Sequence, residues 1–312
     1  MPSRFRRAFC SSFSSSFSAA FSSAFLVLSL ATPGTAAAAE PLAFLNAGGP
    51  SQGAQVPALD RAVVRFAGMA SGSYFWQDGL VAEQLIDGLA TAVHRKELAL
   101  PGDRRLLSSY RRMNDGAERA AVLVDDRSGE VLAAALVHRG CGAAPTCRGD
   151  DQHAELVVFL RPGVDRAEAQ PLLAWSTQVP KDDLDSGKDE QIVRTDHVTL
   201  DAAHTAARPA ARPQGFAAQV PLYPNAQLNS TAQQAVSNAK AGRVMRLQTT
   251  DSQEQVIAYY KQLSPPLKDF VSSMNGPAGF IAGSSKGVAF VVNLTHGRRM
   301  PAVTNIEMEV SQ

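Results

Sequence analysis

Neither sign of charge is in excess in this sequence, and acidic residues are missing from its first part. The 312 residues include 30 Lys and Arg against 29 Asp and Glu, a formal net charge of +1. Such a balance gives no overall field that would attract nucleic acid or an acidic membrane surface. The sequence also lacks a phosphate-binding glycine loop and a dinucleotide-binding fingerprint. We therefore expect no nucleic-acid partner and no cofactor.

The amino-terminal segment, residues 1–39, contains neither Asp nor Glu. Arginines near its start precede a Ser- and Phe-rich run, the apolar segment 24–30 and the small residues 35–39. This order resembles a secretory signal peptide that is cleaved before Glu40. The apolar segment is too short to cross a bilayer of about 30 Å, so no transmembrane segment is expected after cleavage. We expect a periplasmic or secreted protein; an organelle transit peptide is the alternative, because such leaders are also Arg- and Ser-rich.

After the leader, the sequence predicts an α+β protein of two small domains. A flexible lead-in rich in Pro and Gly covers residues 40–54, and helices followed by a β-meander are expected over 55–178. Residues 179–219 are polar and then rich in Ala, Pro and Arg, which is typical of a linker, although 190–200 could add one strand. Residues 220–312 are expected to form a second α+β module.

In the first domain, apolar residues recur first at helical spacing and then in continuous β-like runs. The expected elements are helices over 58–69, 74–98 and 103–113, strands over 120–124, 131–137 and 153–160, and a helix that begins at Asp165 and carries Trp175. The first two strands flank a Gly-containing turn and predict a hairpin.

The second module is organised around one strand and one helix. Residues 242–249 alternate as in a half-buried strand, and Thr250 or Asp251 can cap a helix that ends before Pro265. Three more strands are expected over 279–282, 288–294 and 305–310. The order β-α-β-β-β predicts a two-layer sandwich with one helix against a mostly antiparallel sheet.

Two short motifs in this module give a resemblance to known proteins. The Tyr223-Pro-Asn-Ala226 opening and the run Thr250-Asp-Ser-Gln-Glu-Gln-Val256, with Tyr259 and Tyr260 after it, resemble a module of bacterial exported proteins and lipoproteins of unknown function. The resemblance covers roughly the last ninety residues. It implies an exported bacterial origin and provides no catalytic residues.

Only two cysteines follow the leader, Cys141 and Cys147. In an oxidising compartment two cysteines that close a small loop are expected to pair, so we predict a disulfide between them. The alternative is a zinc site formed by His138, Cys141, Cys147 and His153, because two Cys and two His suit tetrahedral zinc. The spacing of these four residues follows no standard zinc pattern.

Arginines are the candidates for binding an anion. Four of them fall on the predicted helix 103–113 and two in a later loop; they are Arg104, Arg105, Arg111, Arg112, Arg298 and Arg299. Such clusters can bind phosphate or an acidic polymer. Nearby acidic residues and the near-neutral total charge favour a solvated face with local ion pairs instead.

Two further motifs were considered for chemistry. Gly283-Ser-Ser-Lys-Gly287 has the spacing of a nucleophile elbow, but a β-branched run follows it, which favours a hairpin turn. The acidic residues at 182–190 lack the spacing and the central glycine of a calcium loop. Neither motif predicts a catalytic residue.

The leading hypothesis is a non-enzymatic binding or accessory protein of the cell envelope, whose partner is an envelope protein or a small ligand. One alternative is a metal-dependent hydrolase that uses His138, Cys141, Cys147 and His153. The other is a structural subunit of an envelope assembly, which would add a strand to its partner through residues 305–310.

Overall fold

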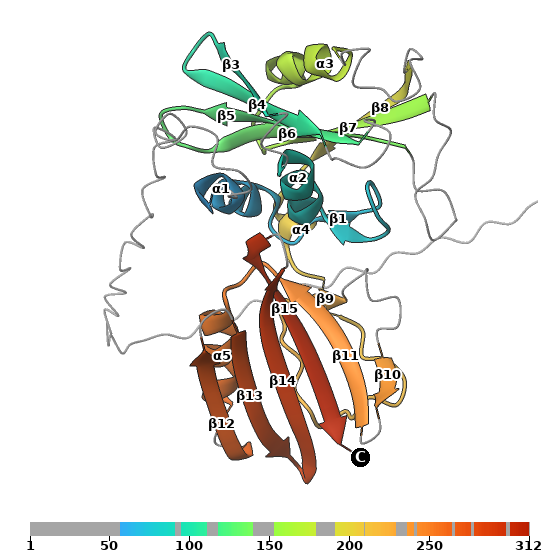
Figure 1. Ribbon diagram of the computed structural model, residues 1–312, viewed down its shortest axis with the longest axis vertical. Coiled ribbons are helices and arrows are strands. Elements are labelled where there is room, and N and C mark those ends of the chain that lie inside the picture. The colour runs from blue at the N-terminus through green and yellow to red at the C-terminus, as the bar shows by residue number, and fades with distance from the viewer. Residues whose placement is uncertain are drawn as a thin grey trace, which may run out of the picture. The chain divides into compact units, whose positions relative to one another are not determined.

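β-structure dominates the protein. The computed structural model describes residues 57–90, 95–110, 118–139, 153–178, 191–208, 210–228, 236–239, 242–263, 266–275, 278–297 and 300–311. Within these residues fifteen strands form three sheets, and the five α-helices are short (Figure 1). The expected α+β fold, with a helical first domain, is therefore wrong: the protein is sheet-dominated.

The first half of the described chain is organised around a six-stranded sheet. Its strands follow one another in chain order. They are β3 (Lys96–Leu100), β4 (Arg104–Tyr110), β5 (Arg119–Asp125), β6 (Val131–His138), β7 (His153–Leu160) and β8 (Gln191–Thr199). All neighbouring strands are antiparallel except β7 and β8, which run parallel. The crossover between these two contains the 3-10 helix η3 (Arg166–Ala169) and the helix α3 (Gln170–Ser176).

Helices cover both faces of this sheet (Figure 1). The helices α1 (Pro57–Ala67) and α2 (Val81–Leu89) pack on one face, and α3 packs on the other. Because successive side chains of a strand point to opposite faces, Val122 belongs to the core under α1 and α2, and Leu123 to the core under α3. Burial of both faces explains why β5, β6 and β7 are continuous apolar runs rather than alternating ones.

A two-stranded sheet, β1 (Ser71–Gly72) and β2 (Gly79–Leu80), lies between α1 and α2 in the chain. The buried amide of Gln84 holds the loop between these strands. Its Oε1 accepts a hydrogen bond from the Phe75 N–H at 2.7 Å, and its Nε2 donates to the Gly72 carbonyl oxygen at 2.9 Å. Satisfying a buried amide on both sides stabilises one conformation of the loop.

A seven-stranded antiparallel sheet forms the second half of the described chain, after α4 (Ala202–Thr205). Its strands are β9 (Gln227–Leu228), β10 (Val236–Ala239), β11 (Gly242–Thr249), β12 (Lys268–Asn275), β13 (Ala278–Ser285), β14 (Val288–Gly297) and β15 (Met300–Ser311). The order is β10-β11-β15-β14-β13-β12, and β9 pairs with β11. The helix α5 (Gln253–Gln262) packs on one face, where Val256, Ile257 and Tyr260 join the core of this sheet.

The last strand, β15, is central in that sheet. Ile306, Met308 and Val310 are buried and the residues between them are half-buried, which confirms the predicted alternation. β15 pairs with β11 on one side and with β14 on the other. Its backbone therefore has no free edge over residues 305–310, and strand addition to a partner through this segment is not possible.

The predicted helices 74–98 and 103–113 are wrong. The first contains β2, α2 and the start of β3, and of its described residues only 81–89 are α-helical. The second contains β4, in which the adjacent Leu106 and Leu107 are both buried, on opposite faces. A strand that is buried on both faces has no alternating pattern, so its apolar residues resembled a helical stripe.

All the described residues fall within one compact unit. Val303 of β15 belongs to the core that α1 and α2 form on the six-stranded sheet. Gln248 of β11 also donates from Nε2 to Oε2 of Glu83 in α2, at 3.3 Å. The two larger sheets are thus connected by packing and by a hydrogen bond as well as by the chain.

Candidate functional site

A groove of about 690 Å³ lies between α3 and the edge of the six-stranded sheet. Strands β3 and β4 form its floor and α3 forms its wall. The residues that line it are Lys96, Glu97, Leu98, Leu100, Leu106, Ser108, Gln170, Pro171, Ala174, Trp175 and Gln178, and we call it the α3 groove. Its volume is in the range of small-molecule sites, which are mostly apolar.

Strand register explains which residues form the floor. Leu98 lies opposite Leu106, and Lys96 lies opposite Ser108, so these four side chains share one face of the sheet. Leu106 belongs to the core under α3, which identifies this face as the α3 side. Helix α3 packs mainly over β5 and β6, and Leu98 on β3 is 56 % exposed.

Helical spacing explains the wall. Gln170 and Ala174 lie four residues apart on α3, and so do Pro171 and Trp175; Gln178 follows two residues after the helix ends. Residues four apart lie on the same face of a helix. One face of α3 therefore lines the groove, while Leu172 is buried against the sheet.

Both ends of α3 are fastened to the sheet. At the carboxyl end, Nη2 of Arg119 on β5 donates to the Ser176 carbonyl oxygen at 2.6 Å, and its Cζ lies 5.9 Å from the centre of the Trp175 ring. At the amino end, Arg104 Nη1 of β4 lies 4.0 Å from Oε2 of Glu168 in η3. A capping box between Asp165 and Glu168 starts η3. These contacts hold the wall in place, so the groove is formed without a ligand.

The lining of the groove is chemically simple. Its described lining contains no His, Cys or Asp, and Ser108 provides its only hydroxyl group. Glu97 is engaged by Arg105, whose Nη1 lies 3.2 Å from its Oε2.

The two histidines of the predicted zinc site are at neighbouring strands, and the two cysteines lie outside the described residues. His138 is buried, with 5 % of its surface exposed, and its ring packs edge-on against Tyr74 with centroids 5.2 Å apart. Burial lowers the pKa of His138 to about 4, so this imidazole is neutral. His153 is exposed at the start of β7. The described residues contain no group of three possible metal ligands.

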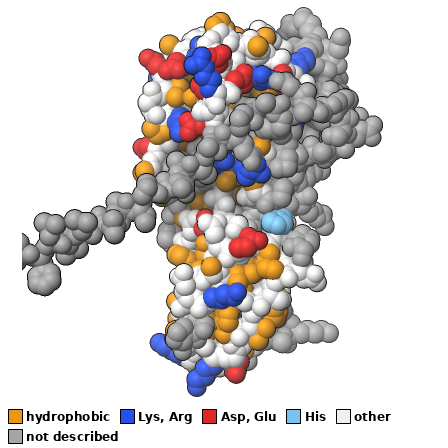
Figure 2. All heavy atoms as spheres, turned by 90° about the vertical axis from the view of Figure 1, so that its left-hand side faces the viewer, with side chains coloured by type: hydrophobic (Ala, Val, Ile, Leu, Met, Phe, Trp, Pro, Cys, Tyr) orange, Lys and Arg blue, Asp and Glu red, His pale blue; other side chains and the backbone are white. Residues whose placement is uncertain are grey.

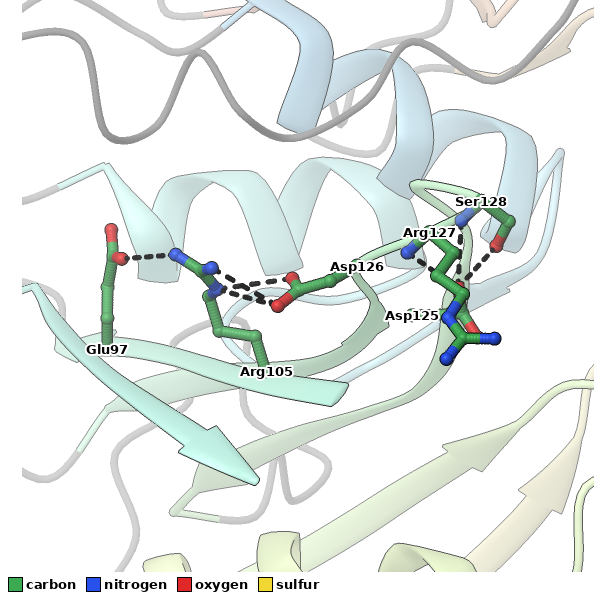
Figure 3. Close-up of polar contacts among 6 residues, drawn as sticks. All are labelled: Glu97, Arg105, Asp125, Asp126, Arg127 and Ser128. Carbon is green, nitrogen blue, oxygen red and sulfur yellow. Dashed lines mark hydrogen bonds and ion pairs between the residues drawn. The ribbon is translucent and has the colours of Figure 1, made fainter. Parts of the chain in front are cut away.

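The predicted helix that would carry the arginine cluster is a strand over its described residues from Arg104 to Tyr110. Arg104 and Arg105 are consecutive residues of β4, so they point to opposite faces of the sheet. Figure 3 shows the Arg105 guanidinium between Glu97 and Asp126, with Nε 3.1 Å from Asp126 Oδ1. The guanidinium of Arg105 is therefore already paired with two carboxylates. Four of the predicted anion-binding residues lie outside the described residues: Arg111, Arg112, Arg298 and Arg299.

Charges of both signs are interspersed on the surface. On the face that Figure 2 shows, Lys and Arg side chains lie among Asp and Glu rather than apart from them. Ion pairs of this kind include Arg194 with Asp196 and Arg246 with Glu307. The surface in that view has no broad basic area of the kind that binds a polyanion.

The Gly283–Gly287 motif forms a hairpin, as predicted. It joins β13 to β14, and Lys286 and Gly287 have positive φ values of 49° and 83°. The hydroxyl of Ser285 donates to the Gln219 carbonyl oxygen at 2.7 Å. This serine serves to hold the 210–228 segment against the sheet.

The motifs behind the resemblance meet in space and have a structural role. The hydroxyl of Tyr223 and the side-chain amide of Asn225 both donate to Oδ2 of Asp251, each at 2.6 Å. The Thr304 hydroxyl donates to the Asp251 carbonyl oxygen at 2.7 Å. Asp251 thus joins the segment before β9, the turn before α5 and β15. Sequence reasoning considered this aspartate only as a helix cap.

Sequence reasoning also missed the α3 groove. The signals were the alternation of Lys96, Leu98 and Leu100 and the four-residue spacing of Gln170, Ala174 and Gln178. The first signal was hidden inside a predicted helix. The second can be interpreted only once β3 and β4 are placed beside α3.

No protein-family model, curated protein or solved structure matches this chain. Among the described residues, the helices are all too short or too polar to pass through a bilayer. The function must therefore be inferred from the chain's own residues.

Proposed function

We propose that the protein is exported into the cell envelope and acts there as a non-enzymatic binding protein that takes a small apolar ligand into the α3 groove. The single observation that carries this proposal is the groove itself, preformed and lined mainly by apolar side chains. Export rests on the leader, residues 1–39, which has the order of a signal peptide.

The exposed apolar side chains of the groove support a binding role. Leu98 is 56 % exposed although it lies beside Leu100 and Leu106. Exposing such a cluster has a free-energy cost of about 25 cal/mol per Å² of apolar surface. A ligand that covers the cluster recovers that free energy, which gives a driving force for binding.

A blocked groove provides the test. Ala174 lines the groove and is exposed, so Ala174→Trp fills the space without entering the core. Ala203 is exposed on α4 and does not line the groove, so Ala203→Trp is the matched control. We expect the neutral probe N-phenyl-1-naphthylamine to brighten with the wild type and with Ala203→Trp, and not with Ala174→Trp. Equal brightening with all three proteins would count against the groove as the binding site.

Export is tested separately. The full chain with a carboxy-terminal tag is expressed in a bacterium. The intact mass of the protein from each cell fraction is then measured by mass spectrometry. We expect a mature protein that begins at Glu40 and lies outside the cytoplasm. An uncleaved chain in the cytoplasm would refute export into the envelope. It would not affect the proposal that the α3 groove binds a ligand.

A further inference from the structure

We infer that the ligand of the α3 groove is an anionic amphiphile, with its negative head group at Lys96 and its apolar tail along Leu98 and Leu100. This inference rests on the proposed binding function and names its ligand class. It follows from the distribution of polar and apolar residues along the groove.

Lys96 lies at one end of the groove, and strand register locates that end. Lys96 lies opposite Ser108, and Arg119 lies opposite Tyr110, two positions further along β4. Because Arg119 donates to Ser176, this part of β4 is next to the carboxyl end of α3. Lys96, Ser108 and Gln178 therefore gather at one end of the groove.

Apart from Gln170 at the amino end of α3, the other part of the groove is apolar. Leu98 and Leu100 follow Lys96 along β3, and Leu106 lies beside them on β4. On the wall, Pro171, Ala174 and Trp175 of α3 line the same space. A single apolar chain placed here would contact side chains of both the floor and the wall.

The charge of Lys96 is available to a ligand. Among the described residues it has no hydrogen-bond or ion-pair partner, whereas its neighbour Glu97 is held by Arg105. The carbonyl oxygens at the end of α3, which would otherwise attract the ammonium group, already have donors. Those of Leu173 and Ala174 accept from the Ser176 and Thr177 hydroxyls, at 2.8 and 3.0 Å, and that of Ser176 accepts from Arg119.

Charge complementarity decides the head group. Among the described lining residues, the ammonium group of Lys96 is the charge without an ion pair, because the Glu97 carboxylate is paired with Arg105 and the groups of Gln178 and Ser108 are neutral. A cationic head group would be repelled there, and a neutral one would gain no ion pair. An anion gains an ion pair with an ammonium group that is otherwise paired only with water.

The experiment compares three ligands of equal chain length by isothermal titration calorimetry. Decanoate and decyltrimethylammonium are titrated into the purified protein below their micelle concentrations, and decan-1-ol below its solubility limit. We expect decanoate to bind about five to ten times more tightly than decan-1-ol and decyltrimethylammonium to bind most weakly. Added NaCl should weaken decanoate binding and leave decan-1-ol binding unchanged, because salt screens only the charged pair.

Variants of Lys96 complete the test. Lys96→Gln should reduce decanoate binding to the level of decan-1-ol, and Lys96→Arg should retain the preference. Lys268→Gln, which removes an exposed lysine of β12, is the matched control and should behave as the wild type.

The outcomes separate the inference from the proposed function. If decanoate and decan-1-ol bind equally and Lys96→Gln changes neither, the groove binds apolar ligands but the anionic head group is refuted. If none of the three ligands binds and N-phenyl-1-naphthylamine does not brighten, the binding function fails and the inference fails with it.

Discussion

Arg119 lies beneath Trp175 and fastens the helix that carries it. Its guanidinium donates to the Ser176 carbonyl oxygen at 2.6 Å, while its Cζ lies 5.9 Å from the centre of the indole ring. The arginine is buried, with 4 % of its surface exposed. One side chain of the sheet thus sets both the position of α3 and the orientation of the aromatic wall of the groove.

Replacing Arg119 should therefore affect stability and binding together. Arg119→Met keeps an apolar chain of similar length but loses the hydrogen bond to Ser176. We expect the free energy of unfolding, measured in urea, to fall by about 1.5–3 kcal/mol, because the lost hydrogen bond involves a charged group. Binding of N-phenyl-1-naphthylamine to the remaining folded protein should also weaken.

The matched control for Arg119 is Arg212. It donates to the carbonyl oxygens of Ala217 and Val220 at 2.6 and 2.8 Å, and its Cζ lies 5.8 Å from the centre of the Phe216 ring. Arg212→Met should destabilise the protein similarly but leave probe binding to the folded protein intact. If both variants weaken binding equally, Arg119 has no specific role in the groove.

Trp175 should report ligand binding directly. The chain has two tryptophans, and only Trp175 lines the groove. We expect decanoate to shift the tryptophan emission to shorter wavelength, because the ligand removes water from the indole ring. Trp175→Phe should abolish this shift and Trp76→Phe should retain it; the reverse result would place the ligand elsewhere.

Two buried titratable groups should change stability with pH in opposite directions. Burial raises the pKa of Asp60 to about 6, from 3.8, although Arg95 and Arg61 oppose the shift. Between about pH 4 and 6 the native state then holds a proton that the unfolded state has lost, so this group lowers stability as the pH rises. The pKa of His138 is lowered from 6.5 to about 4, so His138 raises stability as the pH rises over the same range.

Single substitutions should separate these two effects. In Asp60→Asn the contribution of His138 remains, so we expect the variant to lose stability relative to the wild type as the pH falls from 6.5 to 4. In His138→Gln the contribution of Asp60 remains, and the relative stability should increase on acidification. Each change is expected to be about 1–3 kcal/mol. Urea unfolding at several pH values measures both; parallel pH profiles for the three proteins would contradict the assignment.

Asp251 should contribute more to stability than a surface aspartate. In Asp251→Ala the hydroxyl of Tyr223 and the amide of Asn225 lose their shared acceptor. We expect a loss of about 2–4 kcal/mol in the free energy of unfolding, because two partly buried donors are left unpaired. Tyr223→Phe should cost less alone and almost nothing further when Asp251 is already replaced. Additive losses in this double-mutant cycle would show that the two residues do not interact.

The disulfide between Cys141 and Cys147 stays a prediction. Protein isolated from the envelope should be two hydrogen atoms lighter than its reduced form and should react with a thiol reagent only after reduction. Elemental analysis should find no zinc in the same sample. Free thiols or bound zinc in that sample would favour the alternative site formed with His138 and His153.

The sequence predicted best the apolar strands that lie between other apolar strands of the sheet. The expected strand 153–160 has the bounds of β7, and the predicted hairpin 120–137 corresponds to β5 and β6. In its turn, Oδ1 of Asp125 accepts from the backbone N–H groups of Arg127 and Ser128, at 2.9 and 2.8 Å (Figure 3). Turn chemistry of this kind is local, so it can be inferred from the sequence.

The predictions failed where distant residues decide. The sequence indicated Thr250 or Asp251 as the cap of α5, but the cap is Ser252, in a capping box with Gln255. Asp251 does not serve because Tyr223 and Asn225 engage its carboxylate. The α3 groove was missed for a similar reason: it depends on the lateral offset of α3 from β3, which no local pattern specifies.

The membership of Val303 in the core of α1 and α2 has a consequence for folding during synthesis. A chain that emerges with its amino terminus first presents α1 and α2 long before β15 is available. The contact with Val303 can form only when the carboxy-terminal strand has arrived. Completion of this part of the interior is therefore a late event, delayed until almost the whole polypeptide has been made.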